Sequence, residues 1–146
     1  MQLVPSTTSL LYMVNVSCWS PTLFLAFSAA NGFLAVALGA FGAHGLKQRL
    51  GALADGAERL DWWRTAASYH LGHALALGLV ALFASKTPGV ALSVSGWAFL
   101  AGIALFSGSL YAMVLTGARG LGAVTPLGGL AFLVGWAALF VAAVRR

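Results

Sequence analysis

Charge is scarce in this sequence. Charged residues make up 8% of its 146 residues, and only three of them are acidic. Soluble domains carry about a quarter charged residues, so this chain has too few ionised groups to solvate a globular surface. Apolar residues make up 60% of the chain, and the mean hydropathy is +0.91. This composition excludes a soluble enzyme and a disordered segment, and it indicates an integral membrane protein.

Cysteine is also nearly absent, and the basic residues form no dense patch. Cys18 is the only cysteine, which excludes an intrachain disulfide and a metal site built on paired cysteines. The net charge of +5 rests on eight Lys and Arg residues that are spread between apolar runs. Nucleic-acid binding normally requires a basic patch. We therefore expect the lipid bilayer as a partner, and no nucleic acid.

Four apolar stretches are long enough to cross a bilayer, which takes about 20 residues in a helix. Three of them follow a hydroxyl residue and a proline, the pattern of a helix N-terminus: Ser20-Pro21, Thr87-Pro88 and Thr125-Pro126. We predict spans near residues 21–43, 65–84, 88–115 and 126–144 in a single domain, residues 21–146. The predicted fold is all-α, an integral membrane four-helix bundle. Residues 1–20 form an uncharged leader without the basic region of a secretory signal, and Met13 offers an alternative start.

The loop between the first two spans, residues 47–64, has an amphipathic pattern. Leucines and alanine recur at spacings of three and four, with Lys47, Asp55, Glu58 and Asp61 between them. We predict a short amphipathic helix in the membrane interface here, followed by Trp62 and Trp63 at the water boundary.

The distribution of basic residues predicts the orientation. The termini and the second loop share one side and carry three Lys or Arg residues, whereas the first and third loops carry five. The positive-inside rule therefore places both termini outside the cytoplasm. We expect a multi-pass protein of the bacterial inner membrane.

Small residues recur at four-residue spacing along the predicted spans. In a membrane such residues allow helix backbones to approach closely. The glycines that we expect to pack helices are Gly32, Gly39, Gly102, Gly108, Gly128 and Gly135. The same faces could pack other membrane subunits or a second copy of the chain.

Polar residues within the spans are few, and they include no acid. The candidate polar cluster comprises His44, Tyr69, His73, Ser107, Ser109, Tyr111 and Thr125. Connectivity predicts that five of them, His44, Tyr69, His73, Tyr111 and Thr125, belong to the membrane half of the first and third loops. We interpret it as interhelical hydrogen bonding. A b-type haem between His44 and His73, and a proton relay, are alternatives. A metal site would need three or four convergent ligands, and we expect no metal and no cofactor.

Four motifs follow one another along the chain: GAFGAHGL (Gly39–Leu46), T-A-x-x-Y-x-x-x-H-A-L (Thr65–Leu75), LFSGSLY (Leu105–Tyr111), and TPLGG (Thr125–Gly129) followed by Gly135-Trp136. Together they resemble the YgdD-like family, a group of small uncharacterised four-span membrane proteins with mitochondrial relatives. The resemblance runs from about Phe27 to Val144 and implies the four-span topology without implying an activity. His44 and His73 coincide with family histidines, whereas His70 stands where a residue such as glutamine is expected.

The sequence carries no arrangement of a nucleophile with a base. Ser107 lies in Phe-Ser-Gly-Ser, which is not the Gly-x-Ser-x-Gly motif of a hydrolase. We therefore expect a protein that is not an enzyme but an accessory or assembly subunit packing against other membrane proteins. The alternative is a small oligomeric transporter or channel for a neutral or protonatable solute.

Overall fold

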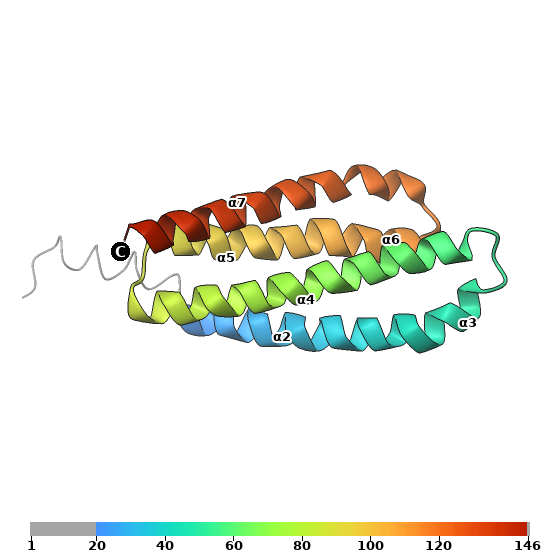
Figure 1. Cartoon of the computed structure of the whole chain (residues 1–146), viewed down its shortest axis with the longest axis horizontal. Coiled ribbons are helices and arrows are strands. Elements are labelled where there is room, and N and C mark those ends of the chain that lie inside the picture. Colours follow the sequence, from blue (N-terminus) through green and yellow to red (C-terminus); the bar gives the residue numbers. More distant parts are fainter. Residues whose placement is uncertain (1–19, 146) are drawn as a thin grey trace, which may run out of the picture.

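The computed structural model describes residues 20–145 as four helical spans that lie side by side (Figure 1). The first span joins α2 (Pro21–Phe41), the π-helical turn η1 (Gly42–Leu46) and α3 (Lys47–Leu50), and the second is α4 (Gly56–Lys86). The third joins α5 (Val90–Gly102), the π-helical turn η2 (Ile103–Ser107) and α6 (Gly108–Thr116). The fourth joins the 3₁₀-helix η3 (Arg119–Ala123) and α7 (Thr125–Val144). By length and composition, all four can cross a membrane. The predicted all-α four-span fold is confirmed.

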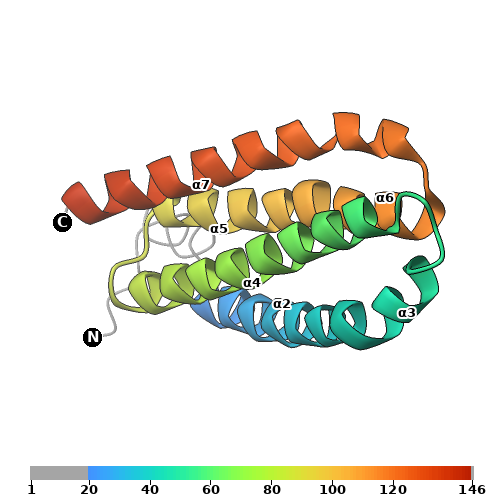
Figure 2. The ribbon, with the colours of Figure 1, turned by 45° about the vertical axis from the view of Figure 1, so that its right-hand side comes forward.

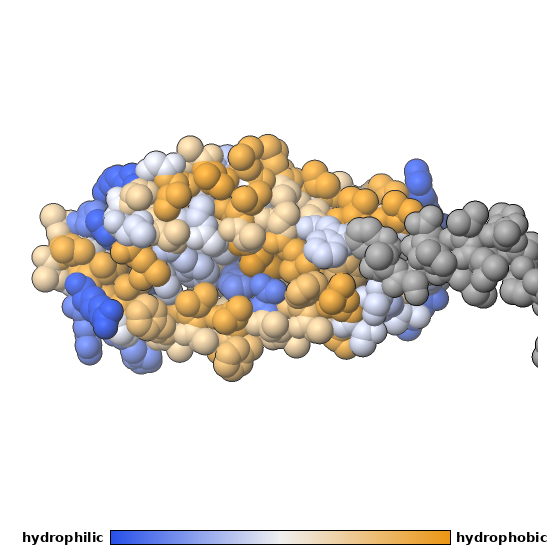
Figure 3. Space-filling view, turned by 180° about the vertical axis from the view of Figure 1, so that it is seen from behind, coloured by the Kyte–Doolittle hydropathy of each residue, from blue (hydrophilic) through white to orange (hydrophobic). Residues whose placement is uncertain are grey.

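The second and third spans form the centre of the bundle. α2 packs mainly against α4 and α7 packs mainly against α5, while α4 contacts both α5 and α6. The start of α2, the α4–α5 turn and the end of α7 lie at one end of the molecule, and the other two turns lie at the opposite end (Figures 1 and 2). Apolar residues cover the length between the two hydrophilic ends, interrupted by a hydrophilic patch halfway along one face (Figure 3).

Proline and glycine set several helix ends. Ser20 is extended before Pro21, as expected for a helix N-terminus. Gly117 ends α6 in the left-handed region, with φ of 75°, and its N–H donates to the Met113 carbonyl at 2.9 Å. The third span begins at Val90 and not at Pro88, because Gly89 before it is still extended.

The predicted interfacial helix between the first two spans is wrong. Lys47–Leu50 is the last turn of the first span, and Gly56 already begins α4, so residues 51–55 are the only turn between them. A Cβ on Gly56 would overlap the Leu50 carbonyl, so glycine permits this tight reversal. The apolar face of the segment is real, but Leu46 and Leu50 pack against Trp63 and Val114 inside the bundle instead of entering lipid.

The predicted position of the Trp63 side chain at the water boundary is also wrong. Its side chain is 2% exposed, and its indole N–H donates to the Leu38 carbonyl at 2.8 Å. It is therefore a core residue that ties α4 to α2, not a side chain at the boundary between lipid and water. Its neighbour Trp62 is partly buried beneath the Arg119 guanidinium, 5.3 Å from the ring centroid.

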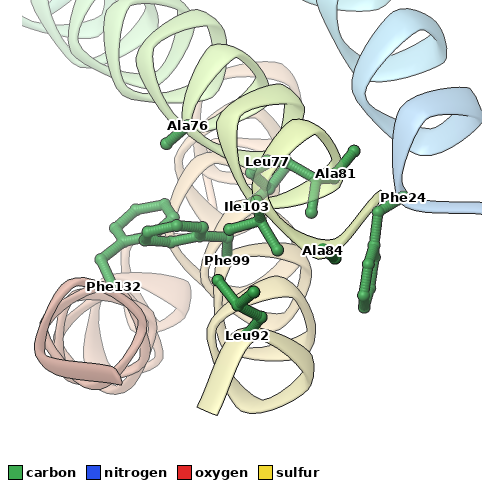
Figure 4. Packing of buried hydrophobic residues seen from close by; sticks show 10 residues of the cluster. Phe24, Ala76, Leu77, Ala81, Ala84, Leu92, Phe99, Ile103 and Phe132 are labelled. Atoms are coloured by element: carbon green, nitrogen blue, oxygen red, sulfur yellow. The ribbon is translucent and has the colours of Figure 1, made fainter. Parts of the chain in front are cut away.

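Aromatic rings that pack onto glycines hold the spans together. A Cβ on Gly102 would overlap the Phe132 ring, and one on Gly135 would overlap the Phe99 ring, so α5 and α7 approach closely through both pairs. Figure 4 shows Phe132 of α7 beside Phe99 on one side of the cluster, with Phe24 of α2 on the other. Such close approach is the main source of helix association in lipid.

Three of the six glycines expected at helix contacts lie elsewhere. A Cβ on Gly32 or Gly39 would meet no described atom within 4 Å, and one on Gly108 would meet only the Ile103 carbonyl of its own span, at 3.9 Å. Small residues do recur at four-residue spacing, but this spacing does not show which face of a helix turns towards a neighbouring helix. By contrast, a Cβ on Gly128 would overlap the backbone of Phe106 in η2.

Candidate functional site

A buried group of polar side chains lies halfway along the bundle. His70 of α4 is 5% exposed, and its Nε2 lies 3.1 Å from Oδ1 of Asn31 in α2. The Asn31 amide nitrogen donates to the Phe27 carbonyl at 2.8 Å, so Oδ1 is the acceptor and His70 Nε2–H is the donor. His70 Nδ1 is then an acceptor without a partner among the described residues.

Two residues of the third span also carry buried hydroxyl groups without a partner among the described residues. Ser107, the last residue of the π turn η2, is fully buried, and Tyr111 follows one turn later. Their hydroxyl groups have no hydrogen-bond partner within residues 20–145. The Tyr111 ring lies 6.1 Å from the His70 ring. We call Asn31, His70, Ser107 and Tyr111 the polar core cluster.

The polar core cluster presents complementary unused hydrogen-bonding groups. Two hydroxyl donors and one imidazole acceptor are buried without a partner among the described residues, and each costs about 1–3 kcal/mol when it stays unpaired. π-helical turns often occur at functional sites, and η2 ends at one of these hydroxyl residues. A small polar molecule that reaches these groups can pair with them, but the cluster lacks the acidic neighbour with which a catalytic histidine is usually paired.

His73 lies outside this cluster, in a groove on the membrane-facing surface. Its ring stacks on Phe132 with centroids 3.4 Å apart. Its Nδ1 is 2.8 Å from the Tyr69 carbonyl and therefore carries the proton, while Nε2 accepts the Trp136 indole N–H at 3.3 Å. Both nitrogens are satisfied in the neutral form. We call this groove of about 650 Å³, lined by Tyr69, His73, Phe106, Phe132 and Trp136 among others, the aromatic groove.

The remaining predicted polar residues do not join His73 either. The hydroxyl groups of Ser109 and Thr125 hydrogen-bond each other at 2.8 Å and thereby connect α6 to α7. His44 is exposed on η1. The seven predicted residues are thus distributed over four places: the aromatic groove, the Ser109–Thr125 pair, the polar core cluster and the surface of η1.

Sequence reasoning missed the Asn31–His70 pair as a site. The predicted polar cluster includes neither Asn31 nor His70, and the family resemblance does not predict a histidine at position 70. The first two spans form an antiparallel hairpin, so polar residues near the middle of each come to a similar depth. Pairing residues by depth along that hairpin could have identified them.

An ion cluster joins the first and third turns at the charged end of the bundle. Asp55 accepts from Arg59 Nε at 3.0 Å, and Arg119 donates to Glu58 at 2.9 Å and to Asp55 at 3.4 Å. Arg59 also donates to the Val114 carbonyl at 3.2 Å. The hydrogen bond from Arg59 holds the pKa of Asp55 below its ordinary value, and Arg119 adds to this effect. We call Asp55, Glu58, Arg59 and Arg119 the loop ion cluster.

The described residues include no group of three or more His, Cys, Asp or Glu side chains that could hold a metal ion. A haem between His44 and His73 would have to compete with the Trp136 indole for His73 Nε2 or with the Tyr69 carbonyl for Nδ1. The polar core cluster is therefore the candidate binding site that the geometry best supports.

Known proteins resemble this chain over most of its length. A family model described as "Protein of unknown function (DUF423)" matches residues 38–129. The UPF0382 membrane protein YwdK of Bacillus subtilis (strain 168) is 48% identical over 123 residues, which cover 84% of this chain and 96% of that protein. The UPF0382 membrane protein SAB0533 of Staphylococcus aureus (strain bovine RF122 / ET3-1) is 42% identical over 123 residues, with the same coverage of 84% and 96%. No solved structure matches the chain.

Proposed function

The chain belongs to the DUF423 family, and we propose that this multi-pass membrane protein is a non-catalytic accessory or assembly subunit of the bacterial inner membrane. In this role it packs against other membrane proteins, or against a second copy of itself, through the outer face of its first span. Nearly all of its described residues belong to the four spans and their short turns, which leaves little mass outside the membrane for other work.

The small-residue face of α2 carries this proposal. Gly32, Val36 and Gly39 follow one another at spacings of four and three, and a Cβ on either glycine would meet no described atom within 4 Å. Val36 is 61% exposed, and only 11% of the most apolar part of the first span is buried. In lipid, small residues favour helix association because they let another backbone approach. Gly102 of α5 and Gly135 of α7 already make close contacts of this kind within the chain, each with a phenylalanine ring of the neighbouring helix.

A leucine at Gly32 tests this role. We expect Gly32→Leu to fold normally, because the added side chain has open space, and to lower recovery of the partner from mild detergent at native expression. Gly72→Leu is the matched control, since Gly72 is also exposed in a span with no atom within 4 Å. The measurements are quantitative mass spectrometry of co-purified membrane proteins and the melting temperature of the chain. Equal recovery with Gly32→Leu and with the unmodified chain would refute the proposal.

We also propose that both termini lie outside the cytoplasm. The first and third turns, which have five basic residues on the helix ends beside them, then face the cytoplasm, in agreement with the positive-inside rule. A reporter that is active only outside the cytoplasm, fused after Arg146, is expected to be active. Activity of a fusion after Arg119, with none after Arg146, would reverse the orientation.

The polar core cluster favours a second candidate, an oligomeric transporter or channel for a neutral or protonatable solute. Its unpaired groups are buried inside the bundle, where a path across the membrane would have to pass. Reconstituted vesicles that report proton flux test this candidate. We expect His70→Leu, but not His73→Leu, to reduce the flux if the path runs through the cluster. A flux that neither change reduces would count against this path.

A further inference from the structure

A second groove lies at the charged end of the bundle, between the first span and α4. It has a volume of about 430 Å³, and Gly39, Gly42, Lys47, Trp63, Arg64 and Ser68 are among its lining residues. We call it the interfacial groove. Its lining residues belong neither to the polar core cluster nor to the aromatic groove, and it shares only Gly39 with the face of α2 that is proposed to pack against a partner.

Two glycines of the first span shape this groove. The Trp63 indole occupies the place that a side chain on Gly42 would fill, and its ring also packs against Tyr111, with centroids 4.6 Å apart. Gly39, about one turn deeper in the membrane, leaves open space beside the wall of α4. Small residues and an aromatic wall thus shape the inner part of the groove.

The mouth of the groove is basic. Lys47 and Arg64 approach it from the two helices, and none of its described lining residues is acidic. Within residues 20–145, Lys47 takes part in no ion pair, and Arg64 uses only Nη1 to bond Asp61, at 2.8 Å. A guanidinium has five N–H donors, so most of them stay available. Asp55 and Glu58 cannot neutralise the mouth, because Arg59 and Arg119 engage them in the loop ion cluster.

A basic mouth above an apolar interior suits one class of molecule. Lys47 and Arg64 lie near the ends of their spans, where lipid headgroups lie, and Ser68 is about 6 Å deeper than Arg64 along α4. We propose that the interfacial groove binds an anionic phospholipid, whose headgroup phosphate lies between Lys47 and Arg64 and whose acyl chains extend past Gly39 into the bilayer. Basic pockets between membrane helices bind anionic headgroups in the same way.

The chain reconstituted in nanodiscs tests this proposal. We expect phosphatidylglycerol to raise the melting temperature above its value in phosphatidylcholine, and to stay bound when the protein is released for native mass spectrometry. The double variant Lys47→Gln/Arg64→Gln should lose both effects. Each basic residue near an anionic surface contributes about five-fold in affinity, so the loss of two predicts about thirty-fold weaker binding.

A matched double variant controls for general surface charge. Arg49→Gln/Lys86→Gln removes the same charge from exposed positions outside the groove, and it should retain the lipid like the unmodified chain. Equal loss in both double variants would overturn the proposal in favour of general attraction. An equal melting temperature in the two lipids would overturn it as well, and so would equal stabilisation by inorganic phosphate in detergent. Gly32 does not line the groove. The test of partner recovery with Gly32→Leu can therefore fail while the test of lipid binding succeeds.

Discussion

A single methyl group at Gly128 should test whether close backbone contact holds α7 in place. Its Cβ would lie 2.7 Å from the Phe106 Cα and would overlap the Phe106 nitrogen. Carbon atoms pack at about 3.5–4.0 Å, so Gly128→Ala requires α7 and η2 to separate by about 1 Å. A backbone cannot rotate away as a side-chain tip can. Overpacking of this kind costs about 1–3 kcal/mol, which raises the unfolding equilibrium constant about 5-fold to 150-fold.

The control for this prediction is Gly39→Ala. It adds the same methyl group in a membrane helix, where no described atom lies within 4 Å, and should leave stability nearly unchanged. Gly102→Ala should fall between the two, because the Phe132 ring that it meets can shift. The assay is equilibrium unfolding by sodium dodecyl sulfate in mixed micelles, followed by circular dichroism. If Gly128→Ala and Gly39→Ala unfold at the same denaturant fraction, the close contact between α7 and η2 does not stabilise the bundle.

Two further predictions concern polar groups at different depths. The pKa of Asp55 is held below its ordinary value of 3.8, so this carboxylate stabilises the fold at pH values above 3.8, and the contribution is lost as the pH falls through the native pKa. The melting temperature should therefore decrease at pH values below about 4, and Asp55→Asn should make this decrease smaller. If the melting temperature of Asp55→Asn depends on pH as that of the unmodified chain does, the argument is contradicted. At His73, a glutamine can keep one donor and one acceptor, so His73→Gln should preserve the melting temperature. His73→Leu leaves the Trp136 indole unpaired, at a cost of about 1–3 kcal/mol. Equal melting temperatures of the two variants would show that the bond to Trp136 contributes nothing to stability.

The number and nature of the spans could be predicted because they depend on composition and length alone. A bilayer demands about 20 apolar residues in each helix whatever the packing, and proline positions add helix starts. The turn at residues 51–55 could not be placed in this way. An amphipathic pattern shows that Leu46 and Leu50 share a face, but not whether that face meets lipid or the Trp63 side chain of the next helix. Only the packing of the hairpin decides between them.

The arrangement of the candidate site could also be predicted only in part. Connectivity predicted correctly that Tyr69, Tyr111 and Thr125 come from the same half of the bundle, since depth follows from counting residues along a helix. It could not give the rotation of each helix about its axis. For the glycines, the four-residue spacing was likewise the same whether the face was filled, as at Gly135, or open, as at Gly32.

His70 and His73 show how much depends on that rotation. The two residues differ by about 60° around α4 and by less than one turn in depth. His73 has both nitrogens bonded, stacks on Phe132 and faces the aromatic groove, so its neutral form is complete. His70 keeps one nitrogen unpaired, and the Tyr111 ring, whose hydroxyl group is also unpaired, lies 6.1 Å from the His70 ring. A ligand entering the bundle can therefore gain a hydrogen bond at His70 without breaking one, whereas at His73 it must first displace the Trp136 indole or the Tyr69 carbonyl. Of the two histidines, His70 is thus the one that the fold leaves available for binding.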